Sequence, residues 1–146
     1  LIIGEGPEER ALQNLSKELK IEENIIFLGY VPEEVKYRYL SQSDIYLLPS
    51  LHEGFGVCLL EAMYCGLPIV ATNNGGQTDF LVDGKNALLV PIKNWQILAE
   101  KIDEICCDRS KRDKMSINNR KDIKKYYIQE IAAQYEKIFD TEKGST

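Results

Sequence analysis

The feature that most constrains the fold of this chain is the alternation of short apolar runs with longer segments of helical character. Apolar runs recur at residues 1–3, 25–28, 45–48, 69–71 and 87–90. Each run is too short for a helix, and such nearly continuous apolar runs are typical of strands buried on both faces. Strands of this kind separated by helices predict an α/β fold, with a parallel sheet, helices on both faces and right-handed crossovers.

Start and stop signals place the helices between these runs. A proline followed by two glutamates opens the helices that we predict after Pro7 and after Pro32. A third helix is predicted near residues 56–65, where Gly66 and Pro68 end it.

The last third of the chain is predicted to be helical from about residue 94 to residue 141, with breaks near 108–110 and Lys125. We expect residues 1–141 to form one domain and residues 142–146 to be a disordered tail. The chain begins directly on an apolar run, so we also expect it to be a fragment of a longer protein.

Composition excludes several classes of function. No apolar run approaches the roughly 20 residues that span a bilayer. The net charge is −5 and no basic stripe is evident, which argues against nucleic acid as the principal partner. The cysteines do not have zinc or redox spacing and there is one histidine, so we expect no metal, reduced thiols and a cytoplasmic location. These residues are Cys58, Cys65, Cys106, Cys107 and His52.

The segment from Pro49 to Met63 is the richest in candidate site residues. Gly54 and Gly56 flank Phe55 at a predicted helix start, where small residues let a ligand approach the backbone. The first N–H groups of a helix have no internal partner, and the helix dipole adds about half a positive charge there. These features predict a phosphate site built from backbone. The alternative is an ordinary junction between a strand and a helix.

Two glutamates lie on either side of this helix start. Glu61 is the only charged residue of an otherwise apolar predicted helix, so we expect the helix to be buried and the carboxylate to need hydrogen-bond donors. Ribose hydroxyls would supply two; a structural pair with Arg or Lys is the alternative. Glu53 precedes the helix, where a carboxylate suits sugar hydroxyls. The two glutamates also admit a second interpretation, the acid/base pair of a glycoside hydrolase.

The segment from Glu53 to Glu61 resembles the two-glutamate signature of the group-one glycosyltransferases of GT-B fold. Other motifs in the family's order are GEGPE at 4–8, NIIFLGYV at 24–31, PS at 49–50, EAM at 61–63, GLPIV at 66–70 and GG at 75–76. The aromatic residues Tyr126, Tyr127, Tyr135 and Phe139 resemble its closing helices. The resemblance covers about residues 1–140. It implies a Rossmann-like domain that is the carboxyl-terminal, donor-binding half of a two-domain enzyme.

The resemblance also implies an activity and a set of roles. The family transfers a sugar from a nucleotide-diphosphate carrier to an acceptor, usually with retention and without a bound metal or other cofactor. Glu53 would be the catalytic residue that binds the donor sugar. The residues at the family's donor-binding positions are Glu61 for the ribose, Gly54, Phe55 and Gly56 for the diphosphate or sugar, Leu60 for the ribose-phosphate, and Tyr30 and Val31 for the base.

Two departures from the family pattern bear on activity. Asp79 stands where the family usually has a glutamate after the paired glycines. The family's Arg and Lys that neutralise the diphosphate precede the region where this chain begins. We therefore expect the isolated chain to transfer no sugar, with acceptor binding and any peripheral membrane contact in an amino-terminal half outside it.

Other interpretations remain beside this one. The chain could be a nucleotide-diphosphate-binding module without transfer activity, and an epimerase- or phosphorylase-like member would need a different constellation around Glu53. We expect His52 to face solvent or to pack rather than to act in catalysis. Trp95, at the start of a predicted helix, is expected to be a packing anchor.

Overall fold

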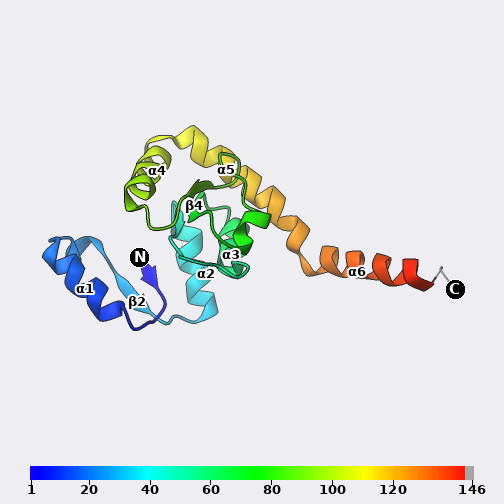
Figure 1. The fold of residues 1–146 in the computed structure, drawn as a ribbon, viewed down its shortest axis with the longest axis horizontal. Helices are drawn as coiled ribbons and strands as arrows, with labels where there is room; N and C mark the ends of the chain where they lie inside the picture. Colours follow the sequence, from blue (N-terminus) through cyan, green and yellow to red (C-terminus); the bar gives the residue numbers. More distant parts are fainter. Residues whose placement is uncertain (144–146) are drawn as a thin grey trace. The chain divides into compact units, whose positions relative to one another are not determined.

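The structure of the chain, a computed structural model, describes residues 1–143, and the side chains up to Phe139 (Figure 1). It divides into two compact units, Leu1–Tyr39 and Leu40–Thr146, of which the second is described to Lys143. Both units are built from parallel strands and helices, which confirms the α/β class. In this described part, no helix is both long and apolar enough to cross a membrane.

The first unit is small and has little buried apolar surface. Its elements are β1 (Ile2–Ile3), α1 (Glu9–Glu18), the 3-10 helix η1 (Glu22–Asn24), β2 (Phe27–Gly29) and the greater part of α2 (Glu33–Gln42). The two strands pair in parallel. In α1 only Ser16 is buried, while Leu12, Leu15 and Leu19 are 44–58% exposed.

The second unit is built on a parallel sheet of order β3-β4-β5. Its strands are β3 (Tyr46–Leu48), β4 (Ile69–Thr72) and β5 (Leu88–Val90). All four residues of the central strand β4 are buried. Leu47 is paired with Val70, which is paired with Leu88, so these three side chains share one face of the sheet.

Helices cover both faces of this sheet, as the sequence predicts. Figure 1 shows β4 between α4 (Trp95–Cys107) and α3 (Val57–Cys65). On the α4 face, a core forms from Val70, Leu88, Val90 and Ile105 with Met115 of the next helix, α5 (Arg109–Asp122). On the α3 face, α3 contributes Leu59, Ala62 and Met63.

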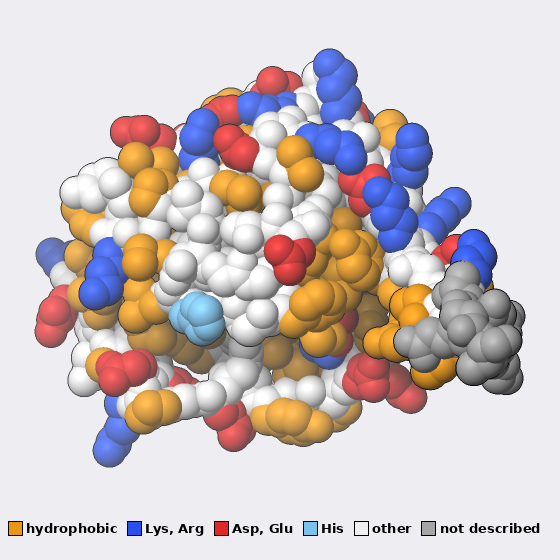
Figure 2. All heavy atoms as spheres, turned by 45° about the vertical axis from the view of Figure 1, so that its right-hand side comes forward, with side chains coloured by type: hydrophobic (Ala, Val, Ile, Leu, Met, Phe, Trp, Pro, Cys, Tyr) orange, Lys and Arg blue, Asp and Glu red, His pale blue; other side chains and the backbone are white. Residues whose placement is uncertain are grey.

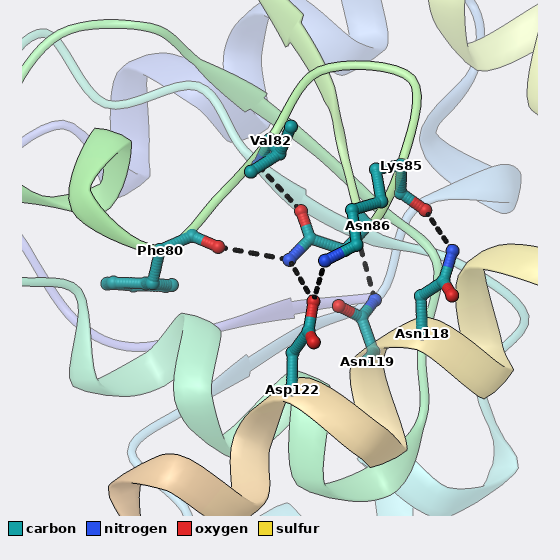
Figure 3. A network of polar contacts seen from close by, with 7 residues as sticks. All are labelled: Phe80, Val82, Lys85, Asn86, Asn118, Asn119 and Asp122. Carbon is teal, nitrogen blue, oxygen red and sulfur yellow. Dashed lines mark hydrogen bonds and ion pairs between the residues drawn. The ribbon is translucent and has the colours of Figure 1, made fainter.

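A polar network joins the loop before β5 to α5 (Figure 3). Asp122 accepts from Lys85 at 2.7 Å and from Asn86 at 3.4 Å. Asn119 donates to the carbonyls of Leu67 at 2.7 Å and of Asn86 at 2.9 Å. Because Asn86 and Asn119 are fully buried, these bonds satisfy groups that would otherwise destabilise the domain.

The chain ends in the 3-10 helix η3 (Ile123–Tyr126) and in α6 (Ile128–Lys143), which contacts η3. The predicted breaks near 108–110 and at Lys125 are confirmed. Several large apolar side chains of α6 are exposed: Ile128, Tyr135, Ile138 and Phe139. Apolar areas also lie among charged side chains of both signs on the face shown in Figure 2. Helix α6 continues to Lys143, and the remaining residues of the predicted tail, 144–146, lie outside the described part.

The sequence predictions about a single sheet and about Trp95 are wrong. The five apolar runs were expected to form one sheet, whereas β1-β2 and β3-β4-β5 are separate sheets. The first two runs resemble the others in composition, but Ile2, Ile3 and Ile26 are exposed rather than buried. Trp95 is 71% exposed and is no packing anchor, because the α4 residues that pack against the core lie further along the helix, beginning at Ile97.

Candidate functional site

The candidate site lies at the carboxyl ends of β3 and β4, the edge at which parallel sheets bind ligands. The loop after β3 runs from Pro49 to Gly56, and the loop after β4 runs from Asn73 to Gly75. Both loops belong to the second unit.

Hydrogen bonds join the two loops directly. Thr72 donates its hydroxyl to the carbonyl of Ser50 at 2.6 Å, and Asn74 donates its amide to Leu51 at 2.7 Å. The backbone of Glu53 forms an isolated parallel bridge with Gly75. The Glu53 backbone is therefore held from the neighbouring loop.

The paired glycines let the loops come this close. A Cβ atom at Gly75 would overlap the carbonyl oxygen of Glu53, and one at Gly76 would overlap that of Gly54. Gly75 also has a φ of +125°, which other residues rarely adopt. The resemblance places a glycine pair here, and the structure supplies the physical reason for it.

The start of α3 presents backbone donors. Gly56 precedes the helix with a φ of +91° and its carbonyl accepts from Leu59 and Leu60, at 2.9 and 3.3 Å. Within the described residues, the backbone N–H groups from Gly54 to Cys58 donate no hydrogen bond to another backbone group. Unpaired N–H groups at a helix N-terminus, together with the helix dipole, are suited to an anion.

The aromatic ring of Phe55 lies against the domain. Its centroid is 5.6 Å from that of Phe80, which in turn lies 5.7 Å from Tyr126. This packing fixes the loop between the two glycines. The side chain is still 46% exposed, so both its ring and its backbone are open to a ligand.

The two glutamates are both half-buried. Glu61 is the one charged residue of α3, but the expectation that α3 is buried all round is wrong. Val57 and Tyr64 are 62% and 57% exposed, because α3 covers only one face of the sheet and has an open side. Leu60, the neighbour of Glu61, is half-buried.

Tyr46 lies near both glutamates and was missed by the sequence analysis. Burial raises the pKa of this phenol well above its usual value, and a hydrogen bond with the Cys58 side chain raises it further. The negative charges of Glu61 and Glu53 act on the pKa in the same direction. In the sequence, the available signal for Tyr46 was its position at the start of a predicted strand. The structure places it on the face of the sheet that α3 covers.

The predicted site residues are divided between the two units of the chain. Glu53, Gly54, Phe55, Gly56, Leu60 and Glu61 all lie at the start of α3 in the second unit. Tyr30 and Val31 lie in the first unit, after β2. There the Tyr30 N–H donates to Glu5 at 3.3 Å, while the Tyr30 side chain is 76% exposed.

Polar residues beside the site show no metal-binding cluster. His52 is exposed, and Asp79 is exposed at the end of the 3-10 helix η2 (Gly76–Asp79). Among the described residues, no group of three or more His, Cys, Asp or Glu side chains could hold a metal ion.

Comparison with known families gives this geometry a context. Residues 1–122 match the family model of the group 1 glycosyl transferases. The chain belongs to this family. It is 31% identical over 140 residues to the N-acetyl-alpha-D-glucosaminyl L-malate synthase of Bacillus anthracis. That match covers 95% of this chain and 36% of the synthase.

Solved structures agree with the family. The carboxyl-terminal domain of a group 1 glycosyl transferase from Francisella tularensis is 30% identical, with a TM-score of 0.76, and the match covers 82% of this chain and 63% of that one. An Anabaena protein solved with UDP shares the fold at a TM-score of 0.85 and 24% identity, over 95% of this chain and 40% of its own. The chain spans about a third of the length of the curated relatives that it matches.

Proposed function

We propose that the chain is the donor-binding part of a glycosyltransferase that transfers a sugar from a nucleotide diphosphate to a glycan, lipid or small-molecule acceptor. One observation carries the proposal: the unpaired N–H groups from Gly54 to Cys58 lie at a helix start between two half-buried glutamates. Donors of this kind suit a diphosphate, and carboxylates suit the hydroxyls on either side of it.

In this proposal each part of the donor has its own partner. The backbone at Gly54–Gly56 holds the diphosphate, where the helix dipole stabilises the negative charge that grows on the leaving group. Glu53 binds the hydroxyls of the transferred sugar, and Glu61 binds the ribose. Leu60 would lie against the ribose-phosphate, and Tyr30 with Val31 against the base.

Relatives support a nucleotide-sugar donor. The Bacillus anthracis relative is named for the transfer of an N-acetylglucosaminyl group, and the Anabaena protein has been solved with UDP and with UDP-glucose. We propose the same class of donor for this chain, with retention of configuration, without a bound metal, and in the cytoplasm. Acceptor binding would belong to the part of the protein that this chain does not include.

The test uses the full-length protein. Calorimetry with UDP, GDP and ADP identifies the base, and product analysis with the corresponding nucleotide sugars measures transfer or hydrolysis. We expect one nucleotide diphosphate to bind and its sugar to be transferred or slowly hydrolysed. Nucleotide binding without transfer or hydrolysis of the sugar would favour a non-catalytic binding module. Absence of binding to all three nucleotides would overturn the proposal.

A further inference from the structure

Gln77 is a fully buried amide beneath the loop that follows β4. It lies in η2, directly after the paired glycines. Its Nε2 donates to the carbonyl of Thr72 at 2.9 Å and to that of Asn74 at 3.1 Å. One side chain thus binds the last residue of β4 and the loop beyond it.

The Asn74 carbonyl also accepts a hydrogen bond from the backbone of Glu53. The Glu53 N–H donates to the Asn74 oxygen at 3.4 Å, and the Gly76 N–H donates to the Glu53 oxygen at 2.9 Å. The Asn74 carbonyl is therefore shared by Gln77 and Glu53. Two hydrogen bonds hold the Glu53 backbone, and the one to the Asn74 carbonyl is the longer and weaker. If the Asn74 carbonyl moved, this bond would be lost first.

The other end of the amide faces the same loop. A Cβ atom at Gly75 would lie 2.8 Å from Gln77 Oε1, which accepts no hydrogen bond within the described part of the chain. A buried acceptor without a donor is unfavourable, so the favourable contribution of this side chain comes from its donor. An apolar side chain of similar length would avoid this cost, but it would remove the side-chain donor from the carbonyls of Thr72 and Asn74.

We propose that Gln77 is the positioning residue for Glu53. Its amide fixes the Asn74 carbonyl, that carbonyl and Gly76 fix the Glu53 backbone, and the Glu53 side chain is thereby held toward the donor sugar. Gln77 touches no substrate in this arrangement. The link to sugar rests on the proposed function, whereas the link to the Glu53 backbone does not.

The chain offers a matched control in Asn119. This amide is also fully buried, donates to two backbone carbonyls, and has an oxygen without a partner. It lies on α5 and bonds to Leu67 and Asn86, away from the Glu53 loop. A purely structural role for Gln77 would lower Tm, as loss of Asn119 should, and would not separate the affinities for a nucleotide and for its sugar conjugate.

The experiment compares Gln77→Met with Asn119→Leu in the full-length protein, since both changes replace a buried amide with an apolar side chain of similar length. Hydrogen exchange resolved to single amides needs no ligand. We expect Gln77→Met to speed exchange at the Glu53 and Gly76 amides about tenfold, because one hydrogen-bonding group is lost. Asn119→Leu should leave these two amides unchanged while lowering Tm by a similar amount.

Binding gives the second measurement. The probes are UDP and UDP-glucose. Gln77→Met should keep the affinity for UDP and should reduce the difference in affinity between UDP-glucose and UDP. Unchanged exchange at Glu53 would overturn the inference, as would an equal loss of affinity for both probes. If the unaltered protein binds neither probe nor any other nucleotide diphosphate, the proposed function fails while the exchange result still decides the role of Gln77.

Discussion

At the scale of the residue, Glu61 is the single charge on α3, one turn beyond the unpaired donors of the helix start. We expect Glu61→Ala to weaken nucleotide-diphosphate binding in the full-length protein by about 1.5–3 kcal/mol, the range for a hydrogen bond to a charged group. The side chain is half-buried, so thermal unfolding is measured as well to separate a loss of affinity from a loss of stability. Calorimetry and thermal unfolding measure the two effects.

Asp103 on α4 provides the control for Glu61. It is an exposed carboxylate on the opposite face of the sheet, and Asp103→Ala removes the same charge without touching α3. Its nucleotide affinity should match that of the unaltered protein. A folded Glu61→Ala variant with full affinity would show that Glu61 does not bind the ribose.

Glu53 is expected to act on the sugar rather than on the nucleotide. Glu53→Gln keeps the backbone bridge to Gly75 and changes only the charge of the side chain. Turnover should fall about a hundredfold, the effect of a misplacement by about 1 Å, while free nucleotide diphosphate binds almost as before. Steady-state kinetics beside a titration with the nucleotide separate the two. Equal losses in both would contradict a role confined to the sugar.

At the scale of the element, the site depends on the close contact of two loops. Gly76→Ala would place a Cβ against the carbonyl of Gly54 and 3.1 Å from the Cα of Phe55, both backbone atoms that have little room to move. We expect a destabilisation of about 1–3 kcal/mol, as for other overpacked sites. Thermal or urea unfolding measures it.

Gly54 is the matched glycine for this comparison. A Cβ there meets nothing within 4 Å, so Gly54→Ala should leave the free energy of unfolding unchanged. The pair of variants distinguishes a glycine required by packing from one that leaves room for a ligand. If Gly76→Ala were as stable as Gly54→Ala, the contact between the loops would not be rigid.

Most elements could be predicted from the sequence, because local signals determine them. Apolar runs marked β3, β4 and β5, and Gly66 with Pro68 ended α3 at the expected place. Burial was harder to predict, since it depends on what surrounds an element. The run of apolar residues in α3 suggested a helix enclosed on all sides, but only Leu59, Ala62 and Met63 are buried.

At the scale of the whole molecule, the limit of the sequence is long-range geometry. Spacing along the chain indicated that Glu53 and Glu61 flank a helix start, and the structure agrees. It gave no sign of Gln77, because the partners of that side chain are backbone carbonyls, which have no sequence signature. Nor did it predict that the strands form two sheets, in units with very different amounts of buried apolar surface.

The two-unit chain should bind donor weakly and transfer no sugar. Its loops at 49–56 and 73–76 contain no Lys or Arg, so these loops offer the diphosphate only backbone donors and the dipole of α3. Leaving-group stabilisation relies heavily on positive charge, and the chain spans about a third of its relatives. We expect dissociation constants near or above about 1 mM, equivalent to about −4 kcal/mol. An NMR titration with UDP, GDP and ADP sugars should shift the signals of Tyr30, Gly54, Gly56 and Glu61. Tight binding or sugar transfer by the isolated chain would contradict the prediction.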